Sequence, residues 1–123
     1  MTKRICDALS TGVVKILGHP TGRIIGKREP YPFDAERIFD CAAANNVWME
    51  INAYPERLDL NDRLSRMAKE MGLKLALGTD SHDVEQMRFM QFGVAVARRA
   101  WLEKKDVANF IPIQELRKIA QYA

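Results

Sequence analysis

Three short apolar runs, separated by segments of helical period, most constrain the fold of this chain. The runs are rich in Val, Ile and Leu, have the length of buried strands, and cover residues 13–17, 47–51 and 73–77. Residues 34–46 and 61–71, between them, repeat apolar side chains at helical spacing. Strands that alternate with helices need crossover connections and form a parallel sheet, so the pattern predicts the α/β class.

Several residues indicate where the helices begin and end. Asp34 and Asn61 are suitable N-caps, and Gly72 is a suitable stop after the second of these helices. Further helices are expected over residues 1–9, 84–99 and 113–122, the middle one with a break near Gly93.

Length and composition predict one globular domain over residues 1–123. A chain of 123 residues with 47% hydrophobic residues has enough apolar surface for one core and is too short for two. The formal charge of +3 agrees with a polyanionic partner, but so small an excess is common in other proteins as well. No apolar stretch approaches the roughly 20 residues of a membrane span, and the N-terminus lacks a signal-peptide core. We expect a cytoplasmic protein with no membrane partner.

The two cysteines, Cys6 and Cys41, lie in segments of helical pattern and have no Cys-x-x-Cys spacing. A disulfide framework and a thiolate zinc site are therefore not expected. The sequence predicts two reduced, packed thiols.

Polar residues follow each predicted strand, in residues 18–23, 52–55 and 78–83. The carboxyl ends of parallel strands meet at one edge, where functional loops converge on a rigid frame. Both histidines of the chain, His19 and His82, lie in these segments.

Asp80 and His82 are separated by one residue and can offer one carboxylate and one imidazole to a divalent ion. Alternatively, Asp80 caps the next helix, His82 is a solvated loop residue, and His19 bonds backbone at its strand end. The three residues together at one edge favour a metal site. Such mixed ligands suit Zn, Mn or Fe.

Several motifs, in order, resemble the C-terminal part of the polymerase-and-histidinol-phosphatase (PHP) domain of bacterial family X DNA polymerases. The resemblance covers residues 3–111, nearly the whole chain. Its motifs are Ile-Leu-Gly-His-Pro-Thr-Gly-Arg at 16–23, Glu-Ile-Asn-Ala at 50–53, Arg-Leu-Asp-Leu at 57–60, Thr-Asp-Ser-His at 79–82, and residues 93–99 followed by Trp101-Leu102.

The resemblance implies a partial TIM-like PHP barrel, with about three β/α units, parallel strands and extra C-terminal helices. His19 matches the late single histidine of the family's metal cluster, and Asp80 and His82 match its final Asp-x-His pair. The early His-x-His pair and the middle Glu and His have no counterpart. The metals implied are Mn or Zn, with Fe or Mg as alternatives.

The resemblance also implies a function. Relatives of this kind are metal-dependent phosphoesterases, 3′-5′ exonucleases or phosphatases, attached to a DNA polymerase and acting on DNA 3′ ends or another phosphorylated substrate. With most of the ligands missing, the chain alone is expected to be inactive. The alternatives are a non-catalytic structural or nucleic-acid-binding module, and a PHP phosphatase on a small substrate such as histidinol phosphate.

Other polar residues near the predicted edge have two interpretations each. Arg23, Arg57 and Asn52 are candidate phosphate or substrate contacts, and Tyr54 is a candidate pocket residue. The alternative for the arginines is a solvated basic loop. Glu50 alternates with apolar neighbours and is interpreted as a structural residue that points into a barrel interior.

We also expect a homodimer. Three β/α units form an open sheet whose two outer strands have unpaired edges. The inner face of the sheet is expected to be partly exposed, with Val13, Ile16, Met49, Ile51, Leu75 and Leu77, or their alternating neighbours, on it. The alternative is a monomer in which the helices at residues 1–9 and 113–122 cover that face.

Overall fold

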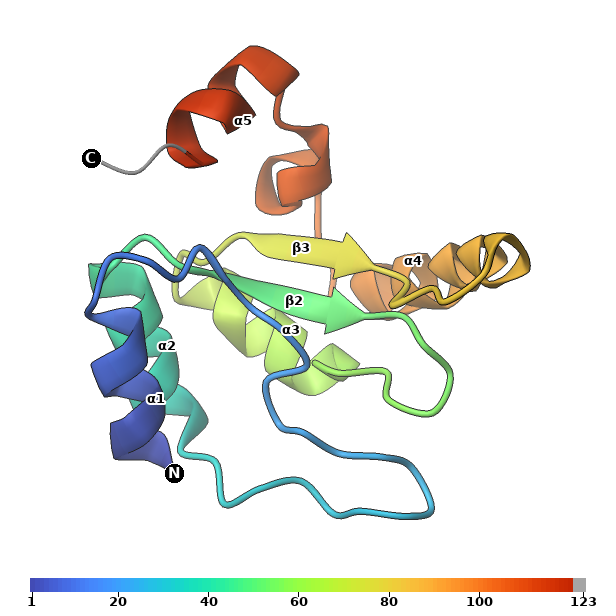
Figure 1. The fold of residues 1–123 in the computed structure, drawn as a ribbon, viewed down its shortest axis with the longest axis horizontal. Coiled ribbons are helices and arrows are strands. Elements are labelled where there is room, and N and C mark those ends of the chain that lie inside the picture. The colour runs from blue at the N-terminus through green and yellow to red at the C-terminus, as the bar shows by residue number, and fades with distance from the viewer. Residues whose placement is uncertain (121–123) are drawn as a thin grey trace.

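The computed structural model describes residues 1–120. The last two positions of the predicted C-terminal helix, 121 and 122, lie outside the described residues. Helices and strands alternate along the first two thirds of the chain, and helices follow (Figure 1). The α-helices are α1 (Thr2–Leu9), α2 (Ala35–Ala44), α3 (Asp62–Glu70), α4 (Met90–Arg99) and α5 (Ile113–Ala120). The strands are β1 (Ile16–Leu17), β2 (Trp48–Asn52) and β3 (Leu75–Gly78), and the 3₁₀ helices are η1 (Val84–Phe89), η2 (Lys104–Asp106) and η3 (Ala108–Phe110).

The strands form one parallel sheet in the order β1-β2-β3, which confirms the α/β class. Leu17 pairs with Met49, and Met49 pairs with Leu75. The first strand is shorter than the sequence predicts, because β2 begins only at Trp48, which pairs with Ile16. Lys15 O still accepts from Trp48 N at 2.9 Å, but residues 13–15 lie outside the strand, and Val13 is 57% exposed.

Local signals placed the helix boundaries correctly at three of four positions. The side chains of Asp34 and Asn61 accept hydrogen bonds from Arg37 N (3.2 Å) and Leu64 N (2.8 Å), as N-caps do. Gly72 follows α3 with a left-handed φ of +86°, as predicted. The break expected near Gly93 instead falls between η1 and α4.

Gly93 lies inside α4 because that helix passes close to the sheet. A Cβ added at Gly93 would lie 3.0 Å from the Cβ of Ala53, just beyond β2, and 3.7 Å from Leu77 Cδ2. The glycine therefore allows close packing of helix on strand and does not break the helix.

The core lies on one face of the sheet, under α2, α3 and α4. Met49, Ile51 and Leu75 point into it and are fully buried against side chains that include Ile38 and Phe39 of α2. Of the two alternatives for the exposed inner face, the set with Met49, Ile51 and Leu75 is therefore wrong on β2 and β3. The alternating neighbours form that face on these two strands, whereas Ile16 of the first set does lie on it.

This second face carries Ile16, Trp48, Glu50 and Ala76, which alternate with the core residues along the three strands. Ile16 is 44% exposed, and the other three are only partly buried. We call these four side chains the bare face of the sheet.

The outer edges of the sheet differ, which corrects the expectation of two unpaired edges. The β3 edge is covered by the segment with η2 and η3: Val107 forms a parallel bridge to Leu75. The Asn109 side chain accepts from Leu77 N (2.8 Å) and donates to Leu77 O (2.9 Å). No strand of the described residues pairs with the outer edge of β1.

Cys6 and Cys41 form a disulfide, so the prediction of two reduced thiols is wrong. The helices α1 and α2 pack side by side and bring the two Cα atoms within 5.6 Å (Figure 1). Sequence spacing carries no information on this contact, because it depends on how two helices pack rather than on a short-range motif.

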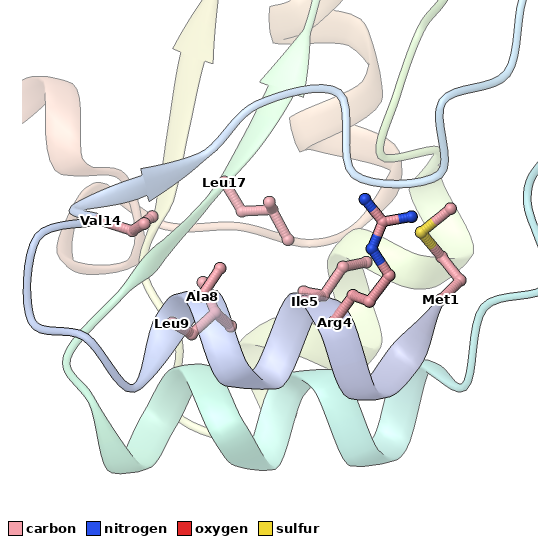
Figure 2. A pocket seen from close by; sticks show the side chains of 7 residues that line it. All are labelled: Met1, Arg4, Ile5, Ala8, Leu9, Val14 and Leu17. Atoms are coloured by element: carbon pink, nitrogen blue, oxygen red, sulfur yellow. The ribbon is translucent and has the colours of Figure 1, made fainter.

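A shallow apolar cavity of about 250 Å³ remains between α1 and the segment that leads into β1. Figure 2 shows Met1, which precedes α1, with Ile5 and Ala8 of α1 on one side and Val14 and Leu17 on the other. The helix thus covers the start of the sheet without filling the space beneath it.

The helices are short. The longest α-helices described, α2 and α4, have 10 residues each. No helix within residues 1–120 combines the length and apolar character of a membrane span.

Candidate functional site

The three strands end at one edge of the sheet, and the candidate residues lie there. His19 comes two residues after the end of β1, Asn52 is the last residue of β2, and Asp80 comes two residues after the end of β3. Because the strands are parallel and adjacent, these residues lie at neighbouring strand ends.

A row of hydrogen bonds crosses this edge. The Glu50 carboxylate accepts from His19 N at 2.7 Å and from the Asn52 amide at 3.5 Å. The same Asn52 nitrogen lies 3.3 Å from an Asp80 carboxylate oxygen. Glu50 and Asn52 therefore connect the loop that carries His19 to the loop that carries Asp80.

The role of Glu50 in this row was not predicted from the sequence. Its carboxylate lies between Gly78, the last residue of β3, and Gly18, which follows β1: a Cβ at Gly78 would be 3.0 Å from one of its oxygens, and a Cβ at Gly18 would be 3.4 Å from the other. Partial burial raises the pKa of Glu50, and the hydrogen bonds from His19 and Asn52 oppose that rise. The signal in the sequence was a glycine at the end of each outer strand.

The backbone at both outer positions is unusual. His19 has φ +26° and Asp80 has φ +55°, in the left-handed region that non-glycine residues seldom occupy. Residues held in such conformations cluster at functional sites, because the surrounding structure must compensate their cost. Asn46 and Trp101 have positive φ as well, away from this edge, so the conformation alone does not mark the site.

His82 lies on the same side but outside the row. Its ring meets the ring of Tyr54 edge-on, with 6.3 Å between centroids, and its backbone N donates to the Gln86 side chain. The next helix is capped by Asp83, which accepts from Gln86 N at 3.0 Å. The alternative in which Asp80 caps that helix is therefore wrong.

Arg23 and Arg57 bridge two loops. Arg23 donates from Nε to Arg57 O (2.7 Å) and from Nη2 to Leu58 O (2.5 Å), and Arg57 donates to Arg23 O (3.4 Å). These bonds join the loop after β1 to the loop after β2. The phosphate contact predicted for both arginines stays a prediction. Some of their N–H groups are already used in these hydrogen bonds between the loops.

Asp59, which the sequence analysis did not single out, anchors the His19 loop. Its buried carboxylate accepts from Thr21 N (3.0 Å) and Gly22 N (3.0 Å), and its backbone exchanges hydrogen bonds with Asn52. Burial raises the pKa of Asp59, against the effect of these hydrogen bonds. Its position in the Arg-Leu-Asp-Leu motif was the signal available in the sequence.

The donors at this edge do not by themselves fit a complete metal centre. Among residues 1–120, no group of three His, Cys, Asp or Glu side chains is arranged to hold a metal ion. His19, Asp80 and His82 are residue types that bind metal ions, but their side chains do not converge closely enough to form such a group.

Comparison with known proteins adds independent information. No protein-family model matches the chain. It is 41% identical over 107 residues to a DNA polymerase/3′-5′ exonuclease PolX from Bacillus subtilis, a match that covers 87% of this chain and 19% of that protein. It is also 26% identical over 115 residues to a probable phosphatase from Aliivibrio fischeri, and 28% identical over 127 residues to one from Thermoanaerobacter sp..

The chain is homologous to these proteins. The expected relationship to bacterial DNA polymerases of the PolX kind is therefore confirmed as homology. The chain spans about a fifth of PolX and less than half of the two phosphatases (42% and 48%), so the activities in their names belong to longer proteins.

Proposed function

We propose that this chain forms part of a PHP-type phosphoesterase and supplies the strand-end portion of its site. The observation that carries the proposal is the hydrogen-bonded row from His19 through Glu50 and Asn52 to Asp80. It lies at the edge where parallel α/β folds place their chemistry, in a chain homologous to PolX.

In this proposal, His19, Asp80 and His82 are ligands of a divalent ion, Mn or Zn, with Fe or Mg as alternatives. An imidazole and carboxylate set suits these ions. Such an ion would neutralise charge on a phosphate group. Because no three donors converge among residues 1–120, the ion needs further ligands, and the chain alone has weak phosphoesterase activity or none.

The names of the relatives support two substrate classes. PolX points to the 3′ ends of DNA, and the probable phosphatases point to a small phosphorylated compound. The higher identity to PolX favours DNA ends, with Arg23, Asn52 and Arg57 as candidate phosphate contacts. A non-catalytic binding or structural module is the second candidate, favoured by the incomplete donor set and by the arginine bonds to backbone carbonyls.

Calorimetric titration with Mn²⁺ tests the metal part of the proposal. We expect weak binding that chelator reverses and that Asp80→Asn or His19→Gln removes. Asp7→Asn is the matched control, because Asp7 is an exposed carboxylate on α1 paired with Lys3. Equal binding by Asp80→Asn and the original chain would exclude this edge as the site.

A second measurement tests the activity. The purified chain is given a single-stranded oligonucleotide and p-nitrophenyl phosphate, with and without chelator. We expect little turnover of either. Robust, chelator-sensitive turnover would show that the donor set is complete in solution, whereas absence of both metal binding and turnover would favour the non-catalytic module.

A further inference from the structure

Two arginines of the loop after β1, Arg23 and Arg28, differ in how their side chains are engaged. Arg23 donates to backbone carbonyls from both Nε and Nη2. Arg28 donates from Nε alone, to Gly22 O at 2.9 Å. Among residues 1–120, the Nη groups of Arg28 have no hydrogen-bond acceptor, and no carboxylate lies within ion-pair distance of them. Arg28 therefore offers a free guanidinium edge, whereas Arg23 is largely used within the fold.

The Arg28 guanidinium is held close to His19. Gly22 N donates to His19 O at 3.0 Å, which closes a turn and brings the two Cα atoms within about 7 Å of each other. Gly22 O in turn accepts from Arg28 Nε. The ring of Tyr31 lies directly against Gly22, where it would clash with a Cβ, and its centroid is 5.5 Å from the Arg28 guanidinium carbon. Two contacts thus fix the arginine beside the turn that carries His19.

The frame beneath this arginine is buried. Thr21 N and Gly22 N donate to the Asp59 carboxylate, and Tyr31 N donates to Thr21 O at 2.8 Å. Asp59 is fully buried, and Thr21 is 4% exposed. A side chain that is held on such a frame before binding loses less freedom when a ligand arrives. Arg28 is in this respect unlike a solvated arginine on a loop surface.

The free edge of Arg28 has the chemistry of a phosphate contact. A guanidinium presents parallel N–H groups that match two oxygens of one phosphate. Under the proposed function, the reacting phosphate lies at His19 and Asp80. Arg28 lies beside that position: it belongs to the long loop between β1 and α2, which runs away from the sheet (Figure 1), and it makes no hydrogen bond to the four residues of the row. A phosphate bound there is therefore a neighbouring one.

We propose that Arg28 binds a backbone phosphate of single-stranded DNA, next to the phosphate that lies at His19 and Asp80. This inference rests on the proposed function and names its substrate class. A small phosphate ester has one phosphate and cannot occupy both positions, whereas a DNA strand carries a phosphate at each nucleotide. Arg28 thus favours a polynucleotide over a small substrate, and Tyr31 acts as the residue that positions it.

A heteronuclear NMR titration of the full chain with a short single-stranded oligonucleotide tests the proposal. Chelator is present, so that the result does not depend on a metal ion. The Arg28 Nε–H group reports on the contact directly. We expect its signal to shift with a dissociation constant of about 100 μM, in the weak range of non-specific nucleic-acid binding. Titration with p-nitrophenyl phosphate should shift this signal much less at equal concentration.

The variant Arg28→Gln and its matched control Lys27→Gln remove the same charge from neighbouring positions. Arg28→Gln is expected to weaken oligonucleotide binding about fivefold and to lower the slope of affinity against salt by about 0.7, the value for one phosphate contact on a single strand. Lys27→Gln is expected to change both quantities less, because no hydrogen bond within residues 1–120 holds its side chain. Arg28→Lys keeps the charge but loses the planar donor pair, so it should recover only part of the affinity.

Several results would overturn the proposal. One is the absence of oligonucleotide binding up to about 1 mM, well above the non-specific range. Equal losses in Arg28→Gln and Lys27→Gln would show that only the general charge of the loop matters, and full binding by Arg28→Lys would exclude the planar contact. Amide signals outside residues 19–31 should stay in place in each variant, which separates a lost contact from a misfolded chain.

The inference and the proposed function fail separately. Mn²⁺ binding at the edge together with oligonucleotide binding that does not depend on Arg28 would overturn the inference alone. The opposite result, oligonucleotide binding that depends on Arg28 in a chain that binds no Mn²⁺, would support the Arg28 contact and contradict the metal-dependent function.

Discussion

The strands are buried more completely in the half of the molecule built on β2, β3, α3 and α4 than in the half that contains α1 and β1. In the first half, Met49, Ile51 and Leu75 are fully buried, and Gly93 lets α4 approach the sheet closely. In the second half, β1 has only two residues and Ile16 is 44% exposed. Shallow cavities lie in both halves, about 250 Å³ beneath α1 (Figure 2) and about 330 Å³ between α3 and α4.

The difference matters because the candidate site crosses the boundary between the halves. Asn52 and Asp80 come from the well-packed half, whereas His19 comes from the loop after β1. The loosely packed half is held by a few specific links: the Cys6–Cys41 disulfide and the hydrogen bonds that Asp59 and Glu50 accept from residues 19–22. Leu9 of α1 is also buried in the core, so apolar packing contributes to both halves, and the hydrogen bonds position the loop that carries His19.

The largest expected effect is in the well-packed half. Ile51→Ala should lower the free energy of unfolding by about 4 kcal/mol, because it removes buried methylene groups and leaves a cavity. The same change at Ile16, exposed on β1, should cost less than about 1 kcal/mol. Urea unfolding of both variants measures the difference, and similar losses would show that the two halves are packed alike.

Removing the disulfide should have the next largest effect. Cys6→Ser with Cys41→Ser opens a loop with a sequence separation of 35 residues, which should cost about 3–4 kcal/mol in the chain-entropy account. Amide exchange should rise most in α1. Reductant should destabilise the original chain and leave the double variant unchanged, and equal stability of the two chains without reductant would show that the link contributes nothing.

Asp59→Ala should cost about 2 kcal/mol, since it leaves the buried N–H group of Thr21 without an acceptor and leaves Gly22 N with only the His19 carbonyl. Chemical unfolding gives the magnitude, and the amide resonances of residues 19–22 should shift. Asp7→Ala, an exposed carboxylate on α1, serves as the control and should cost less than about 1 kcal/mol. A loss no larger than the control's would mean that Asp59 does not hold the loop.

The smallest expected effect is a pH dependence that originates at Asp59. Its pKa in the folded chain lies above the ordinary value of 3.8, so between the two values the folded state binds more protons than the unfolded state. The Asp59 contribution is therefore most favourable below pH 3.8 and is lost as the pH rises through the folded pKa.

Asp59→Asn removes this titration and leaves that of Glu50 in place. The stability of the original chain relative to Asp59→Asn should therefore fall as the pH rises from about 3.8, the ordinary pKa of the group, and then level off. Denaturant unfolding at a series of pH values measures this difference. A relative stability that rises with pH would show that the hydrogen bonds from Thr21 and Gly22 outweigh burial.

The sequence by itself determined the parts of the fold that local patterns specify. Apolar periodicity gave the three strands and the helices between them, and the side chains of Asp34 and Asn61 gave the helix starts, because capping depends on residues three positions apart. The sequence also placed His19 and Asp80 at strand ends, since strand length and parallel order suffice for that.

Only the tertiary structure decided what depends on distant pairs of residues. The disulfide follows from the packing of α1 on α2, and the place of Gly93 follows from the approach of α4 to Ala53. The roles of Glu50 and Asp59 depend on loops about 31 and 38 residues away in sequence. Local patterns cannot fix such contacts, because they arise only once the register of the strands and the packing of the helices are set.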